Sequence, residues 1–284
     1  MRLAQRLARR QLIVVTGKGG VGKTTVSAAL GRLLARDRRV LLLEVDPREN
    51  LHHMLGVAPS GGEIVEAGPG LLLQNIRPVA VVEELVRERL KVGVLVRKVL
   101  KSPVYQQFVE GGPGLKELAV LMHALRLARG GARAKVDVVV LDAPATGHGV
   151  SLLAAPALVS TVIAHGPVGH MARELAAFVA DPERCGIVIV TSAEEMPVDE
   201  ALELIALAGD RLGHRPEAVV VNGLYPPLPS AGEAPPLWVE RRGANLRELA
   251  RLEAAWSGPR IELPLLALDR GPELVAALEE LLAA

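Results

Sequence analysis

The chain has 284 residues, a length that suits one large α/β domain or a domain with an insertion. Half of the residues are apolar and 23% are charged, which excludes disorder as the dominant state. The formal charge of +1 and the six aromatic residues, two each of Phe, Tyr and Trp, argue against a nucleic-acid partner held by charge or base stacking. The single cysteine, Cys185, excludes an intrachain disulfide or an all-cysteine metal site, and fits a cytoplasmic protein.

Short apolar runs alternate with helix-length segments along most of the chain. The N-terminal residues lack the uninterrupted apolar segment of a secretory signal, and residues 1–10 are predicted to form a short basic helix that leads into a strand. Strands are predicted at residues 11–16, 40–45, 136–141, 186–191 and 218–222, and helices at residues 22–35 and 198–212. Crossover helices between such strands predict an α/β fold with a doubly wound, mostly parallel sheet.

Residues 143–172 contain no Asp, Glu, Lys or Arg and raise the alternative of a membrane span. Their apolar part, residues 149–164, would reach roughly 24 Å as a helix and is interrupted by Pro156. Burial against the sheet is the favoured interpretation.

Residues 77–134 interrupt the alternation and are predicted to form an inserted helical subdomain. Leu115, Leu118, Met122 and Leu125 recur at helical spacing, with polar residues off that face. One interpretation is ordinary core packing. The other is a groove for an apolar partner helix, with Leu118, Leu121, Met122 and Leu125 as its candidate lining.

Residues 17–24 read G-K-G-G-V-G-K-T and match the phosphate-loop pattern between a predicted strand and a predicted helix. Glycine backbone N–H groups and the helix N-terminus favour phosphate, and Lys23 supplies a mobile charge to its β- and γ-groups. Thr24 is the candidate Mg²⁺ ligand. The predicted nucleotide-binding residues of this loop are Gly17, Gly19, Gly20, Val21, Gly22, Lys23, Thr24 and Thr25. We therefore expect residues 1–284 to form one P-loop domain that binds a nucleoside triphosphate with Mg²⁺.

Lys18 places a second lysine inside the loop, and K-G-G-V-G-K-T resembles the deviant Walker A ATPases. In that class the additional lysine reaches across a nucleotide-sandwich homodimer to the phosphates of the partner. The resemblance makes Lys18 a candidate catalytic residue in trans, because charge stabilisation would then depend on dimer closure.

Further segments resemble the branch of this class that contains the arsenite-pump and tail-anchored-protein-targeting ATPases. Residues 46–51 read D-P-R-E-N-L, similar to its switch I, and residues 142–148 read D-A-P-A-T-G-H, similar to its switch II. Residues 194–197 read E-E-M-P, as in that branch, and Asn222 ends a later strand, where the branch keeps an Asn that pairs with adenine. The resemblance therefore implies an ATPase domain that binds ATP. The resemblance covers nearly the whole chain.

The resemblance and the chemistry of the side chains imply roles for these positions. Asp46 is placed to orient the attacking water and Asp142 to hold Mg²⁺ through water, although either carboxylate could instead cap a turn. The switch residues Asp46, Asn50, Thr146, Gly147 and His148 are expected to respond to the γ-phosphate, with a structural role as the alternative for His148.

Two functions fit this family branch. In the first, ATP closes a homodimer whose helical subdomains bind a hydrophobic transmembrane-segment client, such as a tail-anchored membrane protein. In the second, the ATPase energises a membrane anion transporter of the arsenite type. Both imply a cytoplasmic protein with transient membrane association. A zinc clasp between subunits is not expected, because the chain has no CxxC, and one thiol cannot supply a metalloid site. Membrane positioning or DNA partition, as in sibling branches, is disfavoured by the acidic C-terminal segment.

Overall fold

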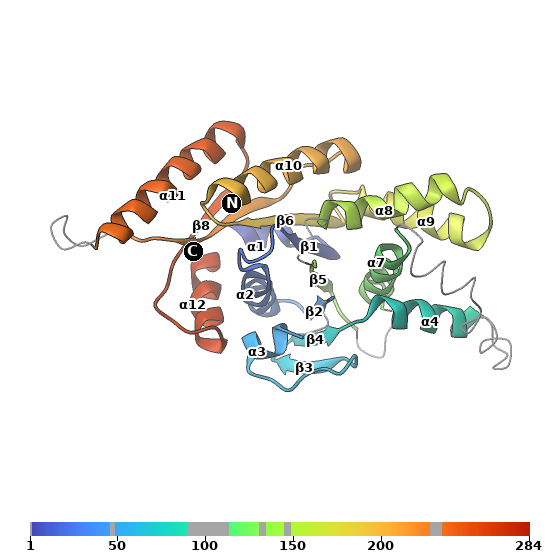
Figure 1. Cartoon of the computed structure of the whole chain (residues 1–284). Helices are drawn as coiled ribbons and strands as arrows, with labels where there is room; N and C mark the ends of the chain where they lie inside the picture. The colour runs from blue at the N-terminus through green and yellow to red at the C-terminus, as the bar shows by residue number, and fades with distance from the viewer. Residues whose placement is uncertain (1, 46–48, 90–113, 131–134, 145–148, 228–234) are drawn as a thin grey trace.

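The computed structural model describes residues 2–45, 49–89, 114–130, 135–144, 149–227 and 235–284 (Figure 1). The strands are β1 Leu12–Thr16, β2 Val40–Glu44, β3 Val65–Gly68, β4 Leu71–Asn75, β5 Val138–Asp142, β6 Cys185–Thr191, β7 Ala218–Leu224 and β8 Arg260–Pro264. The helices before residue 130 are α1 Leu3–Leu7, α2 Lys23–Ala35, α3 Leu51–Leu55, α4 Pro78–Arg89 and α7 Leu115–Ala128. Those after it are α8 Gly149–Val162, α9 Gly166–Val179, α10 Glu195–Leu212, α11 Pro236–Ala255 and α12 Pro272–Ala283.

The strands form one sheet in the order β3-β4-β2-β5-β1-β6-β7-β8. All neighbours are parallel except β3, which pairs antiparallel with β4. This confirms the predicted α/β, mostly parallel, doubly wound fold and each of its five strands. The strands β3, β4 and β8 were not predicted, because they lack the β-branched runs of the central strands.

Alternate residues of the central strands face two separate cores, as the pleat requires. On one face, residues such as Leu12, Val139 and Ile187 pack with α7, α8, α9 and α10. On the other, residues such as Ile13 and Val188 pack with α1, α2, α3 and α12. Figure 1 shows α2 beside α12, and α11 projecting at the opposite end from α4, α8 and α9. Helices therefore cover both faces of the sheet.

The described part of residues 77–134 consists mainly of α4 and α7, which pack against each other, and α7 also contacts α8 and β5. A separate subdomain with these bounds stays a prediction. The uncharged stretch forms α8, which contains Pro156, and part of α9. No described helix has the length and apolar character to cross a bilayer.

The carboxyl ends of β1, β2 and β5 meet at one edge of the sheet. Asp142 at the end of β5 pairs in register with Val15 of β1 and with Glu44 of β2. The loop that follows β1 therefore begins beside Asp142, at the edge where ligands bind in open α/β sheets.

Candidate nucleotide-binding site

The loop between β1 and α2 depends on glycine at two close contacts. Gly17 has φ +148°, and a Cβ there would lie 2.0 Å from the carbonyl oxygen of Val190 in β6. Gly22 has φ +92°, and a Cβ there would lie 2.3 Å from Nδ2 of Asn222. Larger residues would displace β6 or Asn222, so the glycines permit this path of the loop. Gly22 is also the N-cap of α2, which places the loop at a helix N-terminus that favours phosphate.

Lys23, the first residue of α2, is 6% exposed, and its Nζ donates a hydrogen bond to the carbonyl oxygen of Lys18 at 2.7 Å. Burial lowers the pKa of Lys23, while the negative charges of Asp142 and Glu200 act in the opposite direction. A partly desolvated ammonium at a helix N-terminus is suited to a polyanionic ligand, because the negative charge of the ligand would stabilise the protonated form of Lys23.

Asp142 is the acidic centre of the site. The hydroxyl of Thr24 donates to its Oδ2 at 2.7 Å and that of Ser27 to its Oδ1 at 2.9 Å. The pKa of Asp142 is raised to about 6, mainly by burial; the charge of Glu44 acts in the same direction, and the hydrogen bonds from the two hydroxyls and the charge of Lys23 act against it. Ser27 was not predicted, although Thr24 and Ser27 are three residues apart on α2 and so share a face.

The structure brings together Thr24 and Asp142, the two residues predicted to hold Mg²⁺. Hydroxyl and carboxylate oxygens are the hard ligands that Mg²⁺ prefers, and a divalent cation would stabilise the ionised form of the buried carboxylate. The donor set therefore fits the ion. No cluster of three or more His, Cys, Asp or Glu side chains able to hold a metal occurs among the described residues.

Lys18 lies on the same loop and points to a different carboxylate. Its Nζ is 3.2 Å from Oε1 of Glu200 in α10, and both side chains are partly exposed. Glu200 also lies close enough to Lys23 to act on its pKa. Glu200 was not predicted, because no pattern in the sequence connects α10 to this loop.

A cavity of about 730 Å³ opens beside the loop. Its walls come from the loop, the start of α10, the end of β7 and α11; they include Lys18, Gly19, Gly20, Val21, Ser192, Glu194, Asn222, Gly223, Arg241, Arg247 and Glu248. Asn222 lies in this cavity, where its Nδ2 donates to the carbonyl oxygen of Val21 at 2.9 Å. Its amide is thus within reach of a ligand next to the loop, and adenine recognition stays a prediction.

Several predicted residues lie elsewhere or outside the described residues. The hydroxyl of Thr25 is buried and contacts the sulfur of Met54 in α3 at 3.7 Å, so the side chain points away from the cavity. Asn50 is the N-cap of α3. Asp46, Thr146, Gly147 and His148 lie outside the described residues, and their roles stay predictions.

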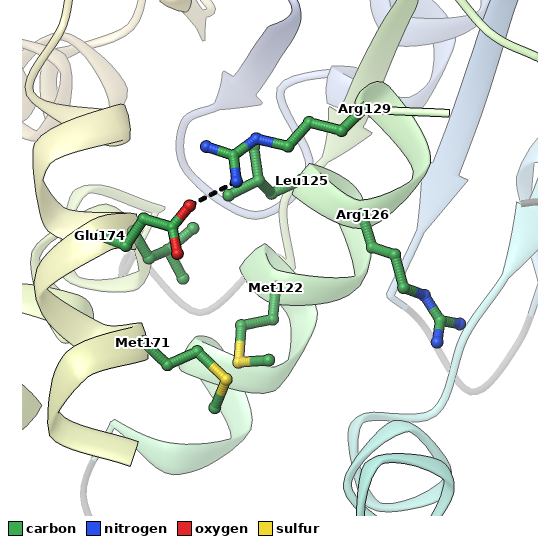
Figure 2. Close-up of a pocket in the computed structure, with 7 residues that line it drawn as sticks. Met122, Leu125, Arg126, Arg129, Met171 and Glu174 are labelled. Carbon is green, nitrogen blue, oxygen red and sulfur yellow. Dashed lines mark hydrogen bonds and ion pairs between the residues drawn. The ribbon is translucent and has the colours of Figure 1, made fainter. Parts of the chain in front are cut away.

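The candidate groove residues occupy α7, and three of the four belong to the core. Leu118, Leu121 and Leu125 are buried, while Met122 is partly buried. Figure 2 shows Met122 of α7 and Met171 of α9 extending into the space between the two helices. This hollow has a volume of about 290 Å³; Leu125 and an Arg129–Glu174 ion pair also line it. In this conformation, therefore, the four residues do not form one exposed apolar groove.

The fold and loop together define a P-loop nucleoside-triphosphate-binding protein. A family model described as "Anion-transporting ATPase" matches residues 10–167, which include the loop, β2 and Asp142. The chain belongs to the anion-transporting ATPase family, as the sequence resemblance predicted.

Three similar curated proteins are all named as ATPases. The arsenical pump-driving ATPase of Escherichia coli is 28% identical over 271 residues, covering 86% of this chain and 44% of that protein. ATPase BagA of Mycobacterium tuberculosis is 30% identical over 210 residues, covering 70% of this chain and 61% of that protein. ATPase GET3 of Malassezia globosa is 30% identical over 150 residues, covering 52% of this chain and 43% of that protein. The chain thus spans about half the length of these relatives.

Proposed function

We propose that this chain is a Mg²⁺-dependent ATPase that couples ATP binding and hydrolysis to the binding and release of a hydrophobic client. The observation that carries the ATPase part is the arrangement at one sheet edge of a phosphate loop, a buried Lys23 at a helix N-terminus, and Asp142 hydrogen-bonded to Thr24. The matched family and the names of the similar proteins support the same activity.

Each residue has a definite task in this proposal. The loop N–H groups and Lys23 bind the phosphates, and Lys23 exchanges the carbonyl oxygen of Lys18 for phosphate oxygens. Thr24 and Asp142 would hold Mg²⁺, which neutralises charge that develops on the phosphoryl oxygens. Asn222 would bind the adenine, and Asp46 would orient the water.

The homodimer is a further part of the proposal, and it concerns Lys18. Its ammonium lies on the rim of the cavity and is paired with a partly exposed carboxylate of its own chain. A pair of this kind contributes on the order of 1 kcal/mol or less, so Lys18 can leave Glu200 for a phosphate of a partner subunit at little cost.

The client part rests on the family and on the helices between residues 77 and 130. The similarity to the protein named ATPase GET3 supports the family, and the resemblance of the sequence to the targeting branch favours a transmembrane-segment client. A second candidate, the energising subunit of an anion transporter, is supported by the 86% coverage of this chain by a pump-driving ATPase. Cys185 is fully buried and its pKa is raised to about 12 by that burial, so the only thiol of the chain is unsuited to bind a metalloid as thiolate.

Two measurements test these proposals. Purified protein should release phosphate from ATP with Mg²⁺ and stop when EDTA is added; turnover that persists in EDTA would contradict the metal-dependent site. Crosslinking in cells in the presence of ATP, followed by identification of the captured chain, separates the two functions. A protein with one C-terminal transmembrane segment supports the client function, and a polytopic transporter supports the second candidate.

A further inference from the structure

Glu44, the last residue of β2, is a buried carboxylate to which the proposed nucleotide site assigns no role. It pairs in register with Asp142 of β5 on one side and with Asn75 of β4 on the other. Only 1% of its surface is exposed. A charge at the ligand-binding edge of the sheet, next to the candidate Mg²⁺ residue, therefore requires a physical explanation.

The carboxylate of Glu44 accepts hydrogen bonds from the start of α3 and from the neighbouring strand. The backbone N–H of Asn50 donates to Oε1 at 2.7 Å, and that of Leu51 lies 3.2 and 3.3 Å from the two oxygens. Nδ2 of Asn75 donates to Oε2 at 3.2 Å. An anion at the N-terminus of a helix satisfies backbone donors that lack an intrahelical partner.

These hydrogen bonds connect the end of β2 to the start of α3. Residues 44 and 50 are joined through one carboxylate, and Asn75 fixes that carboxylate to β4. Asn75 is itself held, because its backbone N–H donates to Oγ of Ser60 at 2.9 Å. The start of α3 therefore cannot move along the sheet edge without leaving a buried charge with fewer donors, which is costly.

We infer that Glu44 is a positioning residue for ATP hydrolysis, which holds the start of α3, including Asn50, at a fixed distance from Asp142. The inference rests on the proposed ATPase function. The oxygens of Glu44 accept hydrogen bonds from backbone donors of α3 and from the amide of Asn75, and none of these bonds involves the phosphate loop. Its loss should thus lower the rate of the chemical step more than the affinity for ATP.

Two substitutions separate geometry from charge. Glu44→Gln retains the length of the side chain but loses the charge and turns an N–H group toward N–H donors. Glu44→Asp retains the charge near Asp142 but is one methylene too short to reach the same donors. We expect both variants to lower kcat about tenfold and to change KM for ATP less than about threefold, in line with the loss of a charge-assisted hydrogen bond.

Glu279→Gln is the matched control. Glu279 in α12 is also a buried carboxylate, and it accepts hydrogen bonds from Arg32 and Arg36 at the C-terminal end of α2, whereas the nucleotide site lies at the N-terminal end of that helix. The Glu279→Gln variant should have a lower melting temperature than the wild type and the same kcat per folded molecule.

The experiment measures kcat, KM and melting temperature for the wild type and these three variants. A kcat loss confined to both Glu44 variants supports the inference. A wild-type kcat in Glu44→Asp with a loss in Glu44→Gln would show that charge alone matters and would overturn it, as would two Glu44 variants that behave like Glu279→Gln. Absence of turnover in the wild type would instead overturn the proposed ATPase function, and the inference with it.

Discussion

Replacing Asp142 by Asn should abolish ATP hydrolysis and at the same time stabilise the nucleotide-free protein. Asn has the same shape and keeps both neighbours, because its Oδ1 accepts from Thr24 and its Nδ2 can donate to the hydroxyl of Ser27. The substitution removes a negative charge from a side chain that is only 6% exposed. This buried charge is needed for Mg²⁺ but is unfavourable without it.

The magnitude follows from the pKa of Asp142, which burial raises from 3.8 to about 6. The folded protein therefore holds the proton more tightly than the unfolded chain, and the free energy of unfolding falls as the pH rises from 3.8 to about 6. Above that pH the full cost is present, about 3 kcal/mol for a pKa difference of about two pH units. At about 2 °C per kcal/mol for a chain of this size, Asp142→Asn should melt roughly 6 °C higher at pH 8.

The assay is thermal melting of both proteins from pH 4 to pH 8 in EDTA, and again with Mg²⁺ and ATP at pH 8. The difference between the two proteins should disappear near pH 4, where Asp142 is protonated, and should grow toward pH 7. Mg²⁺ and ATP should raise the melting temperature of the wild type more than that of Asp142→Asn. An Asn variant that melts below the wild type at pH 8 in EDTA would refute the reasoning.

Three further outcomes are expected. Glu200→Gln should free Lys18 from its own chain and lower the protein concentration at which ATPase activity is half-maximal; an unchanged or higher concentration would argue against Lys18 in trans. Lys18→Ala mixed with Asp46→Ala should recover activity, because one site of each mixed dimer has both groups intact; no recovery, with heterodimers shown to form, would place Lys18 in cis. Leu118→Asp should lower the melting temperature sharply because it buries an unpaired charge, whereas Met122→Asp, at the edge of the hollow, should lower it far less. Equal melting temperatures for these two variants would contradict the burial pattern.

The sequence was most informative where a pattern is local. The strand β1, the loop and α2 follow each other without a gap, and continuous β-branched runs such as that of β7 identify strands buried on both faces. The edge strands β3 and β8 have partly exposed residues and no such run, so hydrophobicity alone did not reveal them. Their positions depend on pairing with neighbours, which is a property of the sheet.

The site shows the same division. Lys23, Thr24 and Asp142 could be predicted because the phosphate loop and the end of a central strand have recognisable contexts. The contacts of Lys18 with Glu200 and of Glu44 with Asn75 join segments that are far apart in the sequence. No sequence pattern distinguishes Glu44 or Glu200 from an ordinary surface glutamate. The burial of Leu118 depends likewise on how α7 packs, because helical spacing is the same for a core face and a groove.

The most direct measurement is the rate of phosphate release from ATP by wild type, Lys23→Ala and the control Lys135→Ala, each verified as folded. Lys135 is exposed, whereas Lys23 is buried in the site. We predict Mg²⁺-dependent turnover in the wild type and in Lys135→Ala, and a loss of about 100-fold or more in Lys23→Ala, as expected when one charge contact to the transferred phosphoryl group is removed. Equal turnover in all three proteins would contradict the assignment of this loop as the ATPase site.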